Sequence, residues 1–482
     1  MNRIFKRFND ISGWLPAYFK WLVSGYRRER PKEAPIDIIF IFVDHYEPAW
    51  NKAMPEEEIE RVTKWTENYA SSVADVVDSD GRPPQHTWFY PYDEINLDCL
   101  HMLSGLCYDG FGEIELHLHH FNDNSERLRA KLHDALEQYG RVGALVSTGN
   151  PLKNNYAFIH GNWALDNSIP NFCGVNDELL CLKESGCFAD FTFPAPNQSQ
   201  PAMVNNIYYA VDDPERPKSY NTGRVLDVSD KNEGDLVIFQ GPLILDYSGF
   251  SFLPKIDDGE IDFYKRFDRR RLNNWLEAGI HVSGKPDWIF IKLFTHGAAP
   301  AAAEILLGGA GKEMHRAIAE CLNATPYRLH FMTAREAYNT AMAACEGRTG
   351  NPNDYRGYIV KPYLNSRIRC NRLYRPIRFD DTAIALEIID GEDTVSVEFD
   401  SGVLRRAEGM IESLEIHTPD SKTATIKAAG IGEITYDIIS AGVISGMNEE
   451  NILAMEQTEH GFEYKVRTYD TDGIHRLELK IG

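Results

Sequence analysis

The sequence predicts an α/β protein: a (β/α) barrel of seven or eight strands followed by a β-rich, sandwich-like domain. From Ile36 to about residue 350, short apolar runs alternate with longer helical stretches, which is typical of βα repeats. Beyond about residue 370, alternating apolar and polar residues are separated by Gly, Asp and Asn turns. A chain of 482 residues is too long for one ordinary core. We therefore expect a helical extension at 1–34, a barrel at 35–365 and an accessory β domain at 366–482.

The individual elements follow from the period of the apolar residues. The strands expected in the barrel are residues 36–43, 87–90, 113–119, 156–160, 188–193, 236–239 or 243–245, 288–294 and 328–332. Helices with one apolar stripe are expected at 56–77, 125–138, 177–185, 263–278 and 334–344. In the accessory domain the alternation predicts strands at 394–399, 411–417, 423–428 and 476–481. Residues 194–217 are rich in Pro and Asn, so we expect a long loop there.

Composition narrows the classes of function. An apolar fraction of 43% and a charged fraction of 25% are ordinary for a folded globular protein. The net charge of −22 repels phosphate backbones, so nucleic acid is not expected as a partner. The eight cysteines contain no Cys-x-x-Cys pair, which favours free thiols in a reducing compartment. We therefore expect a cytoplasmic protein, and nothing in the sequence indicates its oligomeric state.

The N-terminal extension is basic and amphipathic. Its large apolar residues recur at helical spacing among arginines and lysines; they are Phe5, Phe8, Ile11, Leu15, Phe19, Leu22 and Tyr26. It has neither an apolar run long enough to span a membrane nor a cleavage site of a secretory signal. Two interpretations stay open: residues 1–30 contact the inner surface of the membrane, or the helix packs on its own barrel.

Two strand ends predict a metal site. The first expected strand ends at Asp44 and His45, which places both at the barrel mouth, where enzymes of this architecture assemble their sites. In the strand at 113–119, His117 and His119 are two residues apart and so share one face, where they can bind one ion. His120 then points elsewhere unless the strand has already turned. His120, Glu47 and Asp190 are further candidates for the metal shell or its surroundings.

Three other strand ends predict proton transfer and substrate contact. The apolar run Ile291–Phe294 delivers His296 to a loop beside a glycine, and histidine is suited to proton transfer near neutral pH. The ends at 156–160 and 188–193 carry polar and aromatic groups that resemble the walls of a sugar site. The residues expected to contact substrate are Tyr46, His160, Asn162 and Trp163.

Taken in order, these segments resemble the polysaccharide deacetylase family, the NodB-homology or family-four carbohydrate esterases, over roughly residues 36 to 345. In that family the first motif is a strand ending in two aspartates, a general base and a metal ligand. Asp44 matches the base, and His45 stands where the ligand aspartate is found. His117, followed by His119 or His120, stands where the family has two histidines spaced by three residues. His296 matches the catalytic histidine of the last motif.

Two parts of the resemblance are looser. The family's Arg-Pro-Pro-Tyr motif has no counterpart, and the segment from Phe158 to Trp163 stands in its position. The fourth motif is matched by a helix, a Gly-aromatic turn and Asp190. The resemblance implies a (β/α) barrel of the NodB type and one divalent metal, zinc first, with cobalt, nickel or manganese as alternatives. It also marks a divergent subgroup whose substrate the family name does not fix.

The function expected from these observations is hydrolysis of N- or O-acetyl groups on a polysaccharide or glycan precursor. A metal held by His45, His117 and His119 would activate water, Asp44 would take the proton, and His296 would protonate the leaving group. Two alternatives stay open. One is a glycoside hydrolase that uses paired carboxylates such as Asp44, Glu47 or Asp190. The other is a glycan-binding or assembly protein whose catalytic site has decayed.

Overall fold

The computed structural model describes residues 13–31, 34–149, 152–229, 231–247, 254–389, 395–445, 447–469 and 472–482. The chain divides into two units, each assembled from separate stretches of sequence. The first unit consists of Met1–Met102, Phe111–Ala135 and Asn155–Val360. The second consists of Leu103–Gly110, Leu136–Asn154 and Lys361–Gly482. The boundary expected near residue 365 lies close to Lys361, but two segments assigned to the barrel by sequence belong with the C-terminal unit.

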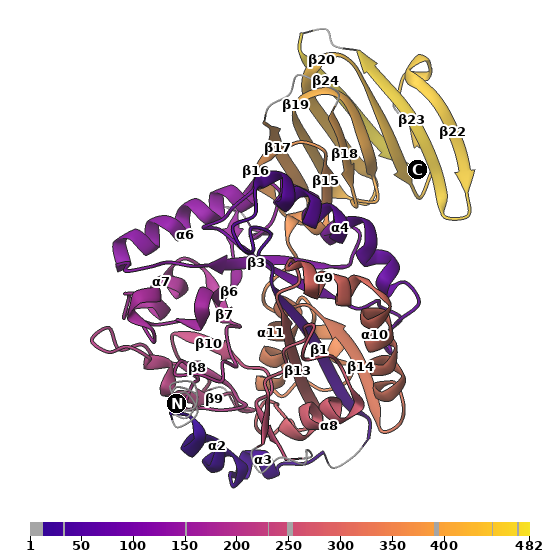
Figure 1. The fold of residues 1–482 in the computed structure, drawn as a ribbon. Coiled ribbons are helices and arrows are strands. Elements are labelled where there is room, and N and C mark those ends of the chain that lie inside the picture. The colour runs from indigo at the N-terminus through magenta and orange to yellow at the C-terminus, as the bar shows by residue number, and fades with distance from the viewer. Residues whose placement is uncertain are drawn as a thin grey trace. The chain divides into compact units, whose positions relative to one another are not determined.

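A ten-stranded, mostly parallel sheet forms the centre of the first unit (Figure 1). Its parallel strands are β1 Ile36–His45, β2 His86–Pro91, β3 Gly112–Leu118, β6 Tyr156–His160, β7 Cys187–Asp190, β10 Leu236–Phe239, β13 Trp288–Thr295 and β14 Tyr327–Met332. Two antiparallel strands, β8 Ile207–Ala210 and β9 Gly223–Val225, extend the sheet beyond β10. The segment expected as one long loop at 194–217 therefore contains β8. The parallel strands bring their carboxyl ends to one edge of the sheet.

One face of this sheet encloses a hydrophobic core. Alternate residues such as Ile39, Ile41 and Val43 of β1 belong to the same cluster as side chains of β6, β7, β10 and β13. The rings of Phe239 on β10 and Phe290 on β13 lie 5.5 Å apart, centre to centre. The sheet is therefore curved, although no pairing between β10 and β13 is seen in the part of the chain that the structure describes, and no closed barrel is detected.

Helices pack around the sheet (Figure 1), and α11 contributes side chains to the same hydrophobic core as β1. In the first unit they are α4 Pro55–Val73, α7 Glu178–Glu184, α8 Arg269–Ala278, α9 Pro300–Leu307, α10 Gly309–Leu322 and α11 Ala334–Cys345. Two more, α5 Leu97–Tyr108 and α6 Ser125–Gly140, begin in the first unit and end in the second. α11 starts where expected, because Thr333 and Glu336 form a capping box that satisfies free N–H groups of the first turn.

The described part of the N-terminal extension packs on the first unit. α2 (Leu15–Leu22) buries Tyr18 and Trp21, and Trp14 before it is also buried in the core cluster. The hydroxyl of Tyr18 accepts a hydrogen bond from the backbone N–H of Leu245 at 3.1 Å. Over residues 13–31 the apolar residues of the extension thus pack on the first unit, which favours this interpretation over membrane contact.

The short helix α3 (Gly25–Arg28) continues this docking. The ring of Tyr26 stacks on His281 with 4.4 Å between ring centres. The hydroxyl of Tyr26 donates to the backbone oxygen of His281 and accepts a hydrogen bond from the backbone N–H of His281. The expected residues Phe5, Phe8 and Ile11 lie outside the described residues. A search of the described residues for a helix that could cross a membrane finds none.

The second unit is an antiparallel β structure. Its strands are β4 Val146–Ser147, β5 Lys153–Asn154, β15 Ile368–Cys370, β16 Tyr374–Phe379, β17 Ala383–Ile388, β18 Val395–Phe399, β19 Leu404–Asp420, β20 Thr423–Ser440, β21 Ile444–Ser445, β22 Ile452–Thr458, β23 Gly461–Tyr469 and β24 Ile474–Ile481. The long strands β19 and β20 pair with one set of neighbours at one end and with another set at the other end.

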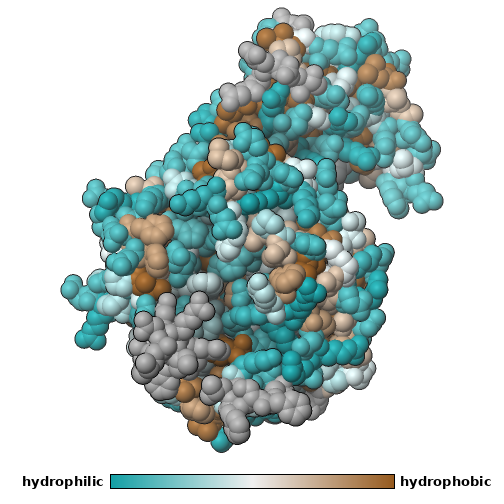
Figure 2. All heavy atoms as spheres, viewed as in Figure 1, coloured by the Kyte–Doolittle hydropathy of each residue, from teal (hydrophilic) through white to brown (hydrophobic). Residues whose placement is uncertain are grey.

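Both halves of this antiparallel sheet contribute to one hydrophobic core. Leu386 of β17 and Leu477 of β24 share a cluster with Val397 of β18 and Val466 of β23. The surfaces visible in Figure 2 are mainly hydrophilic, with hydrophobic residues scattered or in small groups. Each unit therefore buries its apolar side chains in a core of its own.

Candidate functional site

A pocket of about 670 Å³ lies at the edge where the carboxyl ends of the parallel strands meet. Six residues expected to form the site line it: His45, Glu47, His119, Asn162, Trp163 and His296. Trp50, Phe263 and Tyr264 add aromatic surface, and Glu260 adds a carboxylate. The pocket therefore combines imidazoles, carboxylates and flat aromatic walls.

Glu47, His117 and His119 form the first group of possible metal ligands, with ligand atoms within 4.8 Å of one another. Glu47 Oε1 lies 3.1 Å from Nε2 of His117 and 3.4 Å from Nε2 of His119. Burial alone would raise the pKa of Glu47, but the hydrogen bonds from the two histidines outweigh it and hold that pKa well below its usual value. The two histidines share one face of the chain, as their spacing predicts.

Both histidines are held from behind by an oxygen atom. Nδ1 of His117 lies 2.8 Å from the backbone oxygen of Ile159, and Nδ1 of His119 lies 3.1 Å from Oδ2 of Asp93. Such contacts fix a proton on Nδ1, so that Nε2 becomes the ligand atom once a metal replaces the proton it shares with Glu47, which is the usual arrangement around protein-bound metals. Although burial opposes the charge on His119, the hydrogen bonds with Asp93 and Glu47 raise its pKa to about 10.

His45, Glu47 and His296 form the second group of possible ligands, so Glu47 belongs to both groups. The ring centres of His45 and His296 are 4.8 Å apart, and those of His45 and His117 are 5.3 Å apart. Burial, together with the neighbouring histidines His296 and His117, lowers the pKa of His45 well below its usual value. Nδ1 of His296 lies 3.7 Å from Oε1 of Glu260. The backbone of Glu260 forms an isolated β-bridge with Phe294 of β13.

The metal set expected from the sequence, His45 with His117 and His119, is thus altered. His117 and His119 group with Glu47, and His45 groups with Glu47 and His296. The carboxylate of Glu47 reaches the histidines because the chain turns directly after β1, where Glu47 follows His45 by two residues. Glu47, expected only as a secondary candidate, is the residue that links all four imidazoles.

Asp44 does not reach the pocket. Successive residues of a strand point to opposite faces, so His45 projects with Val43 toward the core while Asp44 projects toward the helices. Its Oδ2 lies 2.9 Å from Nε2 of His86, its Oδ1 accepts the backbone N–H of Gly297 at 2.6 Å, and its side chain is fully buried. The expectation that Asp44 and His45 share the mouth of the barrel, and that Asp44 acts there as base, is corrected.

Two further expected site residues are also buried away from the pocket. Tyr46 packs edge-on against Trp65 of α4, with 5.4 Å between ring centres, and has no exposed surface. Asp190 at the end of β7 accepts hydrogen bonds from the backbone N–H and the hydroxyl of Thr192 at 3.1 and 2.6 Å. Neither side chain is available to a substrate, so the substrate role of Tyr46 and the metal role of Asp190 are corrected.

Asn162 and Trp163 occupy the wall of the pocket in an unusual backbone conformation. Both have positive φ angles, 57° and 54°, which side-chain-bearing residues rarely adopt and which is common at functional sites. The ring of Trp163 lies 5.9 Å from that of His45 and 6.0 Å from that of His296. Gly161 before them leaves room for His119, because a Cβ atom there would lie 2.1 Å from Cδ2 of that ring.

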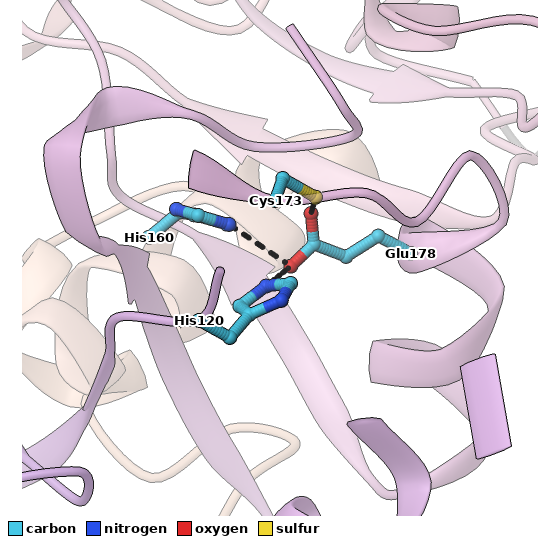
Figure 3. A group of neighbouring side chains, drawn as sticks. All are labelled: His120, His160, Cys173 and Glu178. Carbon is cyan, nitrogen blue, oxygen red and sulfur yellow. Dashed lines mark hydrogen bonds and ion pairs between the residues drawn. The ribbon is translucent and has the colours of Figure 1, made fainter. Parts of the chain in front are cut away.

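His120 and His160 belong to a separate buried cluster, which Figure 3 shows with Cys173 and Glu178. His160 was expected to contact substrate, but it has no exposed surface and faces Glu178, so that role is corrected. His120 points away from His119, as expected for the next residue of an extended chain. Burial lowers the pKa of His160 to about 4 and raises that of the Cys173 thiol well above its usual value. These four residues could hold a metal ion.

Four residues of these groups were missed by the sequence analysis. Asp93 follows β2 by two residues, so the rule that polar residues after a strand line the site would have found it. Glu260, Cys173 and Glu178 come from loops and a helix start far from the histidine motifs. No spacing in the sequence connects them with those motifs.

Compared with models of known protein families, the sequence matches none, and a comparison with curated proteins finds no match either.

Proposed function

We propose that this protein is a metal-dependent hydrolase that removes acetyl groups from a carbohydrate. The observation that carries the proposal is the meeting of Glu47 with four imidazoles at the carboxyl edge of a parallel sheet, where Glu47 and three of the imidazoles line a pocket with aromatic walls. The type of reaction, removal of an acetyl group, is proposed from the resemblance to polysaccharide deacetylases. In keeping with that resemblance, we also propose that the curved sheet is a barrel of that type, since Phe239 and Phe290 bring β10 and β13 together.

The donor atoms around Glu47 fit a zinc ion. Nε2 of His117, Nε2 of His119 and a carboxylate oxygen of Glu47 are the ligand types of catalytic zinc sites with two histidines and one glutamate. Asp93 and the backbone oxygen of Ile159 orient the two imidazoles for this role. A zinc ion bound there would polarise an acyl carbonyl and lower the pKa of a bound water toward about 7.

Proton transfer is assigned to the second group. His45 is kept neutral by burial and by its neighbours, so it can accept a proton from the attacking water. His296, with Glu260 at 3.7 Å from its Nδ1, delivers a proton to the departing amine or alkoxide. This assignment replaces Asp44, whose two oxygens are occupied by His86 and Gly297.

The walls of the pocket suit a sugar ring. Trp50 and Trp163 offer flat apolar faces, and Asn162 offers an amide for a hydroxyl group. The net charge of −22 disfavours polyanionic substrates. We therefore propose a neutral or amino sugar carrying an acetyl group as the substrate class.

The test is release of acetate from acetylated sugar oligomers by the zinc-loaded protein. His117→Ala should lose both turnover and the zinc held by Glu47, His117 and His119, which we call the open site. His133→Ala, which changes an exposed histidine on α6, should retain both. Full acetate release by His117→Ala would contradict the proposal.

Product analysis separates the two alternatives. New reducing ends without acetate would favour a glycoside hydrolase, for which Glu47, Glu260 and Asp262 are the carboxylates that line the pocket. Sugar binding without zinc and without turnover would favour a decayed glycan-binding protein.

A further inference from the structure

The buried cluster of His120, His160, Cys173 and Glu178 lies apart from the residues that line the pocket (Figure 3). His120 follows β3, His160 ends β6, Cys173 follows a short 3-10 turn and Glu178 opens α7. All four side chains are buried, and their ligand atoms lie within 4.8 Å of one another. Four separate stretches of chain thus converge on one point in the interior.

The carboxylate of Glu178 is central to this cluster. Its Oε1 lies 2.9 Å from Nε2 of His120 and 3.4 Å from Nε2 of His160, and its Oε2 lies 3.3 Å from Sγ of Cys173. Two imidazole nitrogens, one sulfur and one carboxylate oxygen make a four-ligand set of the kind that zinc takes in tetrahedral sites. Magnesium and calcium, which prefer oxygen ligands, do not suit it.

The surroundings orient each ligand toward the centre. Nδ1 of His160 lies 2.6 Å from the backbone oxygen of Gly161, which leaves Nε2 without a proton. Nδ1 of His120 lies 3.5 Å from Oδ2 of Asp123. Sγ of Cys173 accepts two backbone N–H groups, from Asn167 at 3.3 Å and from Val175 at 3.4 Å, and its thiol donates to Oε2 of Glu178 at 3.3 Å.

Two imidazole nitrogens of the cluster have no hydrogen bond to the residues that the structure describes: Nδ1 of His120, 3.5 Å from Oδ2 of Asp123, and Nε2 of His160. Nε2 of His160 is buried, has no such partner among the residues that the structure describes, and lies 3.4 Å from Oε1 of Glu178. A buried imidazole nitrogen without a donor is costly and requires an explanation. A cation between this nitrogen, Sγ of Cys173 and the carboxylate would satisfy all three.

We propose that His120, His160, Cys173 and Glu178 hold a structural zinc ion, in a closed site that supplies no ligand position to substrate. The ion would tie the segment of His119 and His120 to the segment that runs from His160 to Trp163. Both segments carry residues of the pocket, so this zinc would act by positioning them. The proposal does not depend on the reaction proposed above.

Replacement of zinc by cobalt(II) tests this site directly, because a cobalt–thiolate bond gives a charge-transfer absorption in the near ultraviolet that histidine and carboxylate ligands do not give. The cobalt-substituted protein should show this absorption. Cys173→Ser should lose it together with one equivalent of metal. Cys181→Ser should keep both, because Cys181 is equally buried but lies outside the cluster.

His117→Ala distinguishes this site from the open one. That variant should keep the cobalt–thiolate absorption although it loses metal from the pocket, and removal of its remaining metal by a chelator should lower its melting temperature. Absence of the absorption in the unmutated protein would overturn the proposal even if Cys173→Ser does not fold. An unchanged melting temperature after chelation would overturn the structural role.

Discussion

Gly161 shows how closely the backbone approaches a metal ligand. A Cβ atom at this position would lie 2.1 Å from Cδ2 of His119, a distance that no side chain tolerates. Gly161→Ala should therefore displace His119 and weaken zinc binding at the open site by about 10–100-fold, the usual effect of disturbing the surroundings of a ligand. Isothermal titration with zinc measures this. Gly25→Ala, where the added methyl group meets nothing within 4 Å, should bind zinc normally.

His296 is assigned to proton transfer, and its substitution tests that assignment. His296→Gln should lower kcat by about 10²–10⁴-fold and leave the zinc held by Glu47, His117 and His119 in place. Steady-state kinetics and metal analysis of the same preparation check both parts. Loss of zinc along with activity would show that His296 is a ligand instead, through the group it forms with His45 and Glu47.

At the level of residues, the sequence predicted well which types of side chain form the site. It predicted less well toward which face of a strand each side chain points. His117 and His119 were correctly placed on one face, because a period of two holds along any extended strand. The same rule separates Asp44 from His45, although the end of the first expected strand was predicted to place both at the barrel mouth. Cys173 and Glu178 could not be found, since only the tertiary fold brings them to His120 and His160.

Among the elements, α2 illustrates how burial determines the contribution of an aromatic residue to stability. Trp21 is 4% exposed and belongs to the core cluster, whereas Phe19 on the same helix is 51% exposed. Trp21→Ala should lower the free energy of unfolding by about 3–5 kcal/mol, while Phe19→Ala should change it by less than about 0.5 kcal/mol. Denaturant unfolding compares the two. Equal effects would mean that the helix does not dock as described.

Glu336 in the first turn of α11 makes stability depend on pH. Its carboxylate binds Arg82 at 2.7 Å and Arg356 at 3.0 Å. Burial opposes its charge, but these arginines outweigh burial and lower its pKa from 4.5 to about 2. A group whose pKa is lower in the folded state stabilises it above pH about 4.5, and this contribution is lost as the pH falls toward 2.

Glu336→Gln should therefore be destabilised at neutral pH by about 1.5–3 kcal/mol, because the half-buried Arg82 and Arg356 lose their charged partner. The difference from the unmutated protein should shrink between pH 4.5 and pH 2. Urea unfolding at several pH values measures it. A difference that stays constant across this range would exclude the carboxylate as its source.

The elements themselves followed well from the sequence where apolar runs were continuous. The strands expected at 156–160 and 236–239 agree with β6 and β10 in both bounds. Helices α9 and α10 were missed, because Gly308, Gly309 and Gly311 interrupt the apolar period between them. β8 was missed because it lies in a stretch whose prolines and asparagines indicated a loop.

At the scale of the molecule, the second unit contains segments from the middle of the chain as well as its C-terminal quarter. Val146 belongs to its core cluster, and the backbone N–H groups of Asn365 and Tyr374 donate to the oxygens of Gly143 and Arg141, both at 3.0 Å. Residues 361–482 expressed alone should therefore lack a cooperative thermal transition, as measured by circular dichroism. A transition as sharp as that of the full chain would show that residues 136–154 are dispensable.

The interleaving of the two units also has a consequence for synthesis. Residues 103–110 and 136–154 leave the ribosome well before 361–482, so their partners do not yet exist when they emerge. Domains made of one continuous stretch can fold in turn during translation. Here the last residues to be made must return to segments released much earlier, and the nascent chain carries these unpaired segments until translation ends.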